Sequence, residues 1–197
     1  GKFEVYNLQI EKYHTYFADG FWVHNDKGVD RQTFKDTAYW NPSIHTDSSG
    51  HAQVSFKLPD NLTTWTIAAL GSTFDTKVGQ TTSEIVVTKD VIVRPILPNI
   101  LRVGDEINLS ALVQNFTDSD QTFDIDLKFD SGDIESALYQ DVVIKSNGMH
   151  HVYWKVWPKT ENDKAKLIFS ARSQSDKKLA DAVTQEIPVR EFGFEEK

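Results

Sequence analysis

The chain has 197 residues, of which 39% are apolar, 12% aromatic and 25% charged, a balance typical of a soluble globular protein. With 21 Lys and Arg against 29 Asp and Glu, the formal net charge is −8, which argues against nucleic acid or an anionic membrane as the main partner. No apolar run is long enough for a membrane helix. Because there is no Cys, the segment itself cannot hold a disulfide, a thiol nucleophile, a thioester or a cysteine zinc site.

The first residues include no initiator Met and no signal peptide, so we expect a fragment of something longer. Residues 1–25 carry two short strand patterns on either side of Asp19-Gly20 and end in Val23-His24-Asn25. The simplest interpretation is a β-hairpin with an Asp-Gly turn.

The same segment also resembles the C-terminal splicing region of inteins and related Hint domains. The resemblance is carried by the Tyr-Asn-Leu core at 6–8, by His14 with the aromatic pair at 16–17, and by the closing His24 and Asn25. It implies that Asn25 is the cyclising residue, whose side-chain amide attacks its own backbone carbonyl and breaks the bond to Asp26. It further implies that His24 assists this step as an acid or base and that His14 is the family's second histidine.

The position after Asn25 differs from the Hint pattern. The splicing reaction requires Cys, Ser or Thr directly after the Asn, and this chain has Asp26 there. We therefore expect simple cleavage of the Asn25–Asp26 bond without ligation, provided that an upstream Hint half with its own nucleophile is present. That half does not lie within these 197 residues.

Residues 26–33 are polar and predict a linker. From residue 51 onward apolar and polar residues alternate with period two, which predicts strands with one buried face, and turn sequences bound each run. Residues 34–90 hold about four or five such strands, whereas residues 91–190 hold about seven, the size of a complete immunoglobulin-like sandwich. The charged residues 191–197 predict a linker to a following domain. The predicted fold class is all-β, with antiparallel β-sandwiches after an N-terminal Hint-type β-hairpin.

A long motif between Arg31 and Asn115 resembles the alpha-2-macroglobulin family, in the macroglobulin-like segment just after the bait region. Its most distinctive parts are Tyr39-Trp40-Asn41-Pro42, Leu58-Pro59-Asp60-Asn61, Thr64-Trp65, Leu97-Pro98 and Gly104-Asp105. These residues include no nucleophile with a base and an orienting group, so we expect them to be structural. Trp40 and Trp65 are predicted to be buried anchors, and Pro59-Asp60-Asn61 is predicted to be a turn between two strands.

The resemblance implies a division into domains. Residues 34–90 would be the second half of a split macroglobulin-like domain whose first half precedes the bait region, and residues 91–190 would be the next complete domain of this kind. It also implies proteases as targets, the upstream half-domain and the downstream domains of the same polypeptide as partners, no cofactor, and a secreted, periplasmic or cell-surface location. The Hint-like residues 1–25 would then occupy the bait position of a bacterial protein.

Three functions stay open at this point: a protease-trapping inhibitor or defence factor, an autoprocessing Hint module that cuts its own chain once, and an interaction scaffold without activity. No metal site is expected. His45, Asp47 and His51 fit a solvated strand face better than a metal site, and the consecutive His150 and His151 point to opposite faces of a strand.

Three asparagines, Asn61, Asn108 and Asn115, begin glycosylation sequons. Such triplets are common by chance, and in a bacterial protein they carry little meaning. We therefore assign them no role from the sequence.

Overall fold

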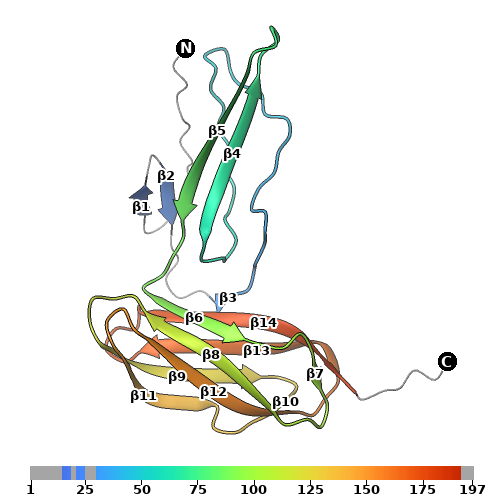
Figure 1. Cartoon of the computed structure of the whole chain (residues 1–197), viewed down its shortest axis with the longest axis vertical. Coiled ribbons are helices and arrows are strands. Elements are labelled where there is room, and N and C mark those ends of the chain that lie inside the picture. Colours follow the sequence, from blue (N-terminus) through green and yellow to red (C-terminus); the bar gives the residue numbers. More distant parts are fainter. Residues whose placement is uncertain (1–14, 19–20, 25–29, 192–197) are drawn as a thin grey trace, which may run out of the picture. The chain divides into compact units, whose positions relative to one another are not determined.

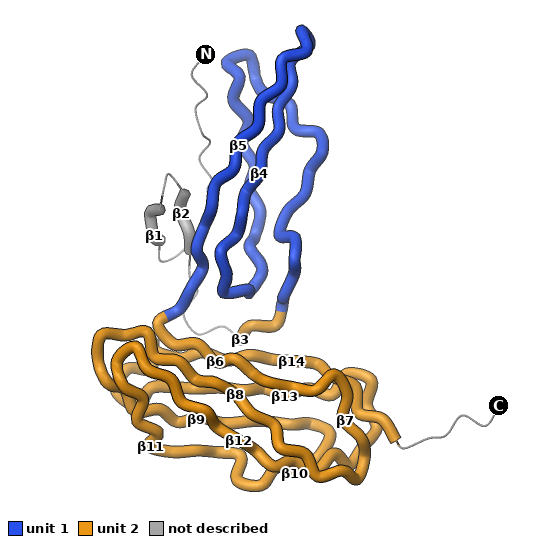
Figure 2. The backbone as a smooth tube through the Cα atoms, viewed as in Figure 1, with its two compact units in different colours: residues 1–26, 33–89 blue, residues 27–32, 90–197 orange. Residues whose placement is uncertain are grey.

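The computed structural model describes residues 15–18, 21–24 and 30–191 (Figure 1). Every regular element in those residues is a strand, so the predicted all-β class is confirmed. Nearly all strand pairs are antiparallel, as predicted; the two exceptions are short parallel pairs that β14 makes with β3 and β7. The chain divides into two compact units, residues 1–26 with 33–89 and residues 27–32 with 90–197, which are called here the first and second units (Figure 2).

The described part of residues 1–25 is a hairpin. Strands β1 (Thr15–Ala18) and β2 (Phe21–His24) pair antiparallel, with Thr15 opposite His24, as the Asp19-Gly20 turn predicts. His14, Asn25 and Asp26 lie outside the described residues.

Residues 33–89 of the first unit contain one long hairpin, preceded by an irregular segment. Strands β4 (Thr64–Ser72) and β5 (Val78–Val86) pair over nine residues each. The four or five strands expected here are thus reduced to two in this range. Residues 51–58 keep the predicted alternation, because the apolar members are half-buried and the polar members exposed, but they join no strand ladder. Instead, the Asp60 and Asn61 side chains accept the backbone N–H groups of Thr33 and Lys35, at 2.8 and 3.0 Å.

The second unit is a sandwich of two sheets (Figure 1). One sheet has the order β10-β12-β8-β6, from the strands Gly132–Ile134, Met149–Pro158, Ile107–Asn115 and Val91–Ile96. The other has the order β11-β9-β13-β14-β3, from the strands Leu138–Ile144, Gln121–Phe129, Asn162–Ser173, Ala180–Arg190 and Asp30–Arg31, and β7 (Leu101–Arg102) also pairs with β14.

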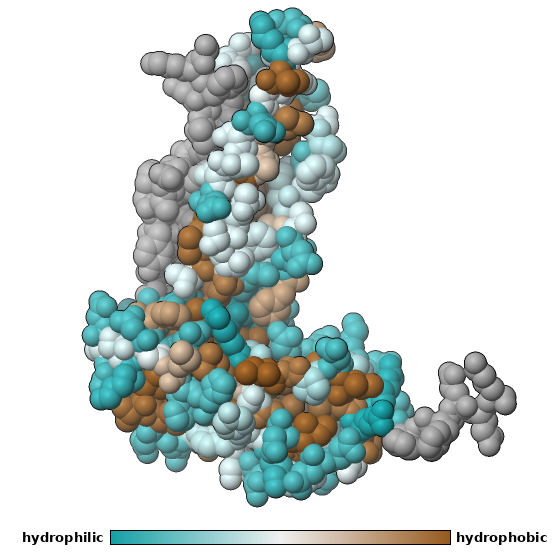
Figure 3. Space-filling model, in the orientation of Figure 1, coloured by the Kyte–Doolittle hydropathy of each residue, from teal (hydrophilic) through white to brown (hydrophobic). Residues whose placement is uncertain are grey.

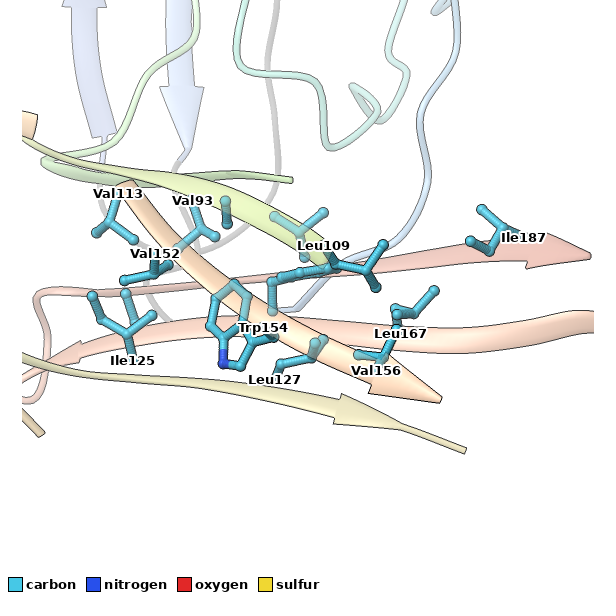
Figure 4. Close-up of a cluster of buried hydrophobic side chains, with 14 of the residues drawn as sticks. Val93, Leu109, Val113, Ile125, Leu127, Val152, Trp154, Val156, Leu167 and Ile187 are labelled. Carbon is cyan, nitrogen blue, oxygen red and sulfur yellow. The ribbon is translucent and has the colours of Figure 1, made fainter. Parts of the chain in front are cut away.

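The core of the second unit lies between these two sheets (Figure 4). Each strand supplies every second side chain to it, which is why the period-two pattern predicted this region well. At its centre the indole of Trp154 is fully buried and meets the rings of Phe169 and Tyr139 edge-on, with centroids 5.5 and 5.7 Å away. Its Nε1 donates to the carbonyl of Ala137 at 3.1 Å, so the one polar atom of the ring is satisfied.

The range 26–33, expected to be a linker, contains a strand. Asp30 and Arg31 form β3, which pairs in parallel with β14 so that Asp30 lies opposite Ala182 and Arg31 opposite Val183. Two of the polar side chains that suggested a linker, those of Asp30 and Arg31, instead bind partners in the second unit.

Candidate functional site

The predicted Hint residues are placed only in part. His24 is the last residue of β2, while His14, Asn25 and Asp26 lie outside the described residues. The roles assigned to these four residues by resemblance therefore stay predictions.

The residues of the long motif do not gather in one place. Trp40 was expected to be a buried anchor, and this is wrong: its side chain is 80% exposed, in a run of irregular, exposed residues from 39 to 51. A ring in such a segment has no apolar face against it and stays in water. Trp65, on β4, is half-buried beside the small cluster formed by Ile85, Ile67 and Val87.

Several other motif residues lie in loops and take part in backbone hydrogen bonds. The turn that Pro59-Asp60-Asn61 was expected to make between two strands is not found as such, because only β4 follows and residues 51–58 form no strand. Pro59 is buried, and the N–H of Asp60 donates to the Thr33 carbonyl at 2.7 Å, which ties residue 33 to residue 60. Pro42 and Pro98 are exposed. Gly104 has a φ of +84°, which favours glycine, and its N–H donates to the carbonyl of Pro158. The exposed Asp105 closes the same turn by donating its N–H to Arg102.

No metal centre is found among residues 30–191, where no cluster of three or more His, Cys, Asp and Glu occurs. Asp47 instead caps its own turn, accepting the Ser49 hydroxyl at 2.6 Å and the backbone N–H groups of Ser49 and His51. These bonds, the hydroxyl first, lower the pKa of the Asp47 carboxyl. In the described part of the chain, no helix is long and apolar enough to span a membrane.

The second unit contains a buried ion pair that sequence reasoning missed. The guanidinium of Arg31 on β3 donates from Nε to Oδ1 of Asp181 at 3.0 Å and from Nη2 to Oδ2 at 2.7 Å. This is the fork geometry in which arginine binds carboxylates most strongly. Arg31 is 8% exposed and Asp181 2% exposed, so water screens the pair little.

The same two side chains also bind the backbone of β6. The N–H of Val93 donates to Oδ2 of Asp181 at 2.9 Å, and its carbonyl accepts Nη2 of Arg31 at 2.8 Å. β6 is the last strand of its sheet, so these bonds satisfy backbone groups on an edge that no further strand covers there. The ion pair thereby joins one sheet to the other. We call the three residues Arg31, Val93 and Asp181 the β3 anchor.

One signal in the sequence could have revealed the β3 anchor. Asp181 stands in phase with Val183, Ile187 and Val189, the buried face of β14. A carboxylate at such a position needs a cation. Its partner lies 150 residues earlier in the chain, however, and no local pattern identifies it.

Comparisons with known proteins complete the description. Residues 37–127 match the model of the alpha-2-macroglobulin family. The chain is 34% identical over 169 residues to an alpha-2-macroglobulin of Thermotoga maritima, a match that covers 84% of this chain. The chain belongs to the alpha-2-macroglobulin family. An alpha-2-macroglobulin homolog of Nostoc is 35% identical over 108 residues, or 55% of this chain.

The match to these family members covers only part of their length, 10% of the Thermotoga protein and 5% of the Nostoc protein. Among solved structures, an Escherichia coli alpha-2-macroglobulin activated by porcine elastase superposes with a TM-score of 0.60 at 16% identity, over 82% of this chain and 15% of that one. A Salmonella alpha-2-macroglobulin reacted with methylamine gives a TM-score of 0.56 at 22% identity, over 68% of this chain and 9% of that one. These likenesses establish the fold of this macroglobulin segment.

Proposed function

We propose that the chain is part of a protease-trapping inhibitor or defence factor, secreted, periplasmic or exposed at the cell surface. The observation that carries this proposal is the match of residues 37–127 to the alpha-2-macroglobulin family. Because the chain spans about a tenth of the Thermotoga relative, trapping would be a property of the whole protein, with proteases as its targets.

In this proposal, residues 34–90 are the second half of a split macroglobulin-like domain, residues 91–190 are a complete one, and residues 191–197 lead to a following domain. Apolar side chains reach the surface along β4 and β5 (Figure 3), among them Leu70, Val78 and Val86 at 81, 77 and 66% exposure. A two-stranded hairpin is marginal by itself. An upstream half-domain that covers this hairpin and the exposed Trp40 would supply the missing face.

The trap is tested on the full-length protein. It is mixed with proteases of different specificities, and the activity of each protease is then measured on a large protein substrate and on a small peptide. A trap encloses the protease, so we expect activity on the large substrate to fall while activity on the peptide is retained, together with co-elution of the two proteins. If the protease keeps its activity on both substrates and does not co-elute with the protein, trapping is excluded.

A second candidate function is self-cleavage between Asn25 and Asp26. It is favoured by the Hint-like residues of 1–25 and by the hairpin of β1 and β2, which ends at His24. The Asn25 amide would attack its own carbonyl, forming a succinimide and releasing the amine of Asp26.

The intact mass of the full-length protein and of its Asn25→Ala variant tests this chemistry. If an upstream Hint half is present and folded, we expect a fragment starting at Asp26 in the wild type and none in the variant. The rate in His24→Ala should fall by roughly 10²- to 10⁴-fold, the usual effect of losing an acid or base. Asp26→Ser supplies a hydroxyl acceptor and should restore some ligation. If every form stays intact, residues 1–25 are an inert hairpin and only the scaffold interpretation is left for them.

A further inference from the structure

The order of the strands gives the β3 anchor an unusual place in the chain. The chain enters the second unit as β3, leaves it to build residues 33–89 of the first unit, and returns as β6 at Val91. The anchor joins these two passages directly, because Arg31 on β3 binds the carbonyl of Val93 on β6. Both ends of residues 33–89 are therefore attached to the second unit, one by the peptide chain of 89–90 and the other through β3.

The retention of β3 depends on side-chain contacts more than on its backbone ladder. The strand itself has only two residues, which is too short for its backbone ladder to retain it against fraying. The Asp30 carboxylate accepts hydrogen bonds from the Thr184 hydroxyl and from Nε2 of Gln32. Arg31 makes at least three hydrogen bonds in a site from which water is nearly excluded. We therefore expect the ion pair of Arg31 and Asp181 to contribute most to the retention of β3.

The proposed cleavage sites all lie before this strand. Both an exposed insert at the bait position and the Asn25–Asp26 bond precede Asp30, and a cut at the latter would leave only four residues, 26–29, ahead of β3. After either cut, β3 would become the N-terminal strand of the C-terminal piece.

We propose that the second unit holds a binding site for the chain end created by such a cut, with Arg31 as the side chain that fills it and Asp181 and Val93 as its receptor. The cut end then stays bound as β3, and residues 33–89 keep both attachments. This inference rests on the proposed function for the origin of the cut, but the site itself needs only a chain end upstream of Asp30.

The experiment makes the cut without relying on natural processing. A recognition sequence for a specific protease is inserted between residues 25 and 26 of the full 197-residue chain, and amide hydrogen exchange is followed before and after cutting. The readouts are peptides covering 27–33 and 90–96, the latter including the Val93 amide that donates to Asp181. Amides of β13 at Phe169 and Ala171, both in the buried core, report whether the sandwich is folded.

In the wild type we expect exchange of both peptides to change by less than about twofold on cutting. In Asp181→Asn we expect an increase of about tenfold or more in the cut form, with the β13 amides still protected. Arg31→Lys keeps the positive charge but loses the two-pronged hydrogen bonding to Asp181. Exchange of the two peptides in its cut form should be faster than in the wild type and slower than in Asp181→Asn. The matched control is Asp120→Asn, because Asp120 also holds one cation, Lys145, and one backbone N–H, from Ser146, but is exposed. It should behave as the wild type.

Two results would overturn the proposal. If cutting alone deprotects residues 27–33 in the wild type, the upstream chain holds β3 and the anchor does not. If Asp181→Asn and Arg31→Lys both keep full protection after cutting, the ion pair is not the receptor. If Asp181→Asn also loses protection of the β13 amides, its sandwich is unfolded. The exchange of Arg31→Lys after cutting then decides whether the ion pair holds β3. Because an added protease makes the cut, failure of natural cleavage leaves this outcome unaffected.

Discussion

Replacing Trp154 by alanine tests the claim that the second unit folds around one core. The indole is fully buried, contacts the rings of Phe169 and Tyr139, and donates a hydrogen bond to Ala137. Truncating a buried Trp to Ala costs about 3–5 kcal/mol, since the lost transfer free energy adds to that of the cavity. In a domain of this size that corresponds to a fall in melting temperature of about 12 °C or more.

Trp40 provides the matched control, because it is the same side chain at 80% exposure. Trp40→Ala in this chain should change the free energy of unfolding by no more than about 0.5 kcal/mol. Thermal unfolding followed by near-ultraviolet circular dichroism compares the two variants. Equal losses would refute the reasoning, because they would mean that burial does not distinguish the two rings. In the full-length protein, a larger loss for Trp40→Ala would indicate that an upstream half-domain covers it.

Two further predictions concern one glycine and one carboxylate. A Cβ on Gly132 would lie 2.2 Å from the Trp157 carbonyl oxygen. Gly132→Ala should therefore lower the free energy of unfolding, measured by chemical denaturation, by about 1–3 kcal/mol. Gly71 has open space around it, so Gly71→Ala should leave that free energy unchanged. The hydrogen bond from the Lys145 ammonium, followed by that from the Ser146 N–H, lowers the pKa of the Asp120 carboxyl below its ordinary value. The stabilisation is therefore present above the ordinary pKa and is lost as pH falls through the folded pKa. An NMR titration should show a lowered pKa of Asp120 that rises in Lys145→Met.

The sandwich of the second unit was largely predictable, and the reason is local. In β8, β9, β12 and β13 the pattern of apolar residues alone fixes which face is buried, and turn residues between them mark the ends. A sheet with one apolar face must bury that face, and two such sheets do so by packing against each other. Alternation requires no knowledge of which strands pair, and for that reason it gave the class correctly.

Where the sequence reasoning failed, the missing information was not local. Residues 51–58 alternate like a strand, yet a strand also needs a neighbour with free backbone groups, and the pattern says nothing of this. Trp40 was expected to be buried because of its size, although burial depends on what faces it. The pairing of Arg31 with Asp181 joins residues 150 apart and depends on the complete fold. The same limit applies to the β3 anchor. The sequence motif can be read residue by residue, but the contact of Arg31 with Val93 and Asp181 exists only in the folded chain.

Asn115 shows how burial separates two residues that look alike in sequence. Asn108 and Asn115 both begin sequons and both lie on β8, but Asn108 is exposed and Asn115 is fully buried. The Asn115 amide donates to the carbonyls of Ser119, Ile144 and Lys145 at 2.9–3.2 Å, which fixes the loops around the end of the strand.

Asn115→Asp should therefore destabilise the second unit strongly. The substitution removes both N–H donors and places a carboxylate against carbonyl oxygens, and an unsatisfied buried polar group costs about 1–3 kcal/mol, more when it is charged. Asn108→Asp, at an exposed position of the same strand, should stay within about 0.5 kcal/mol of the wild type. Chemical denaturation at neutral pH measures both. If the two variants unfold at the same denaturant concentration, the Asn115 amide does not hold its loops.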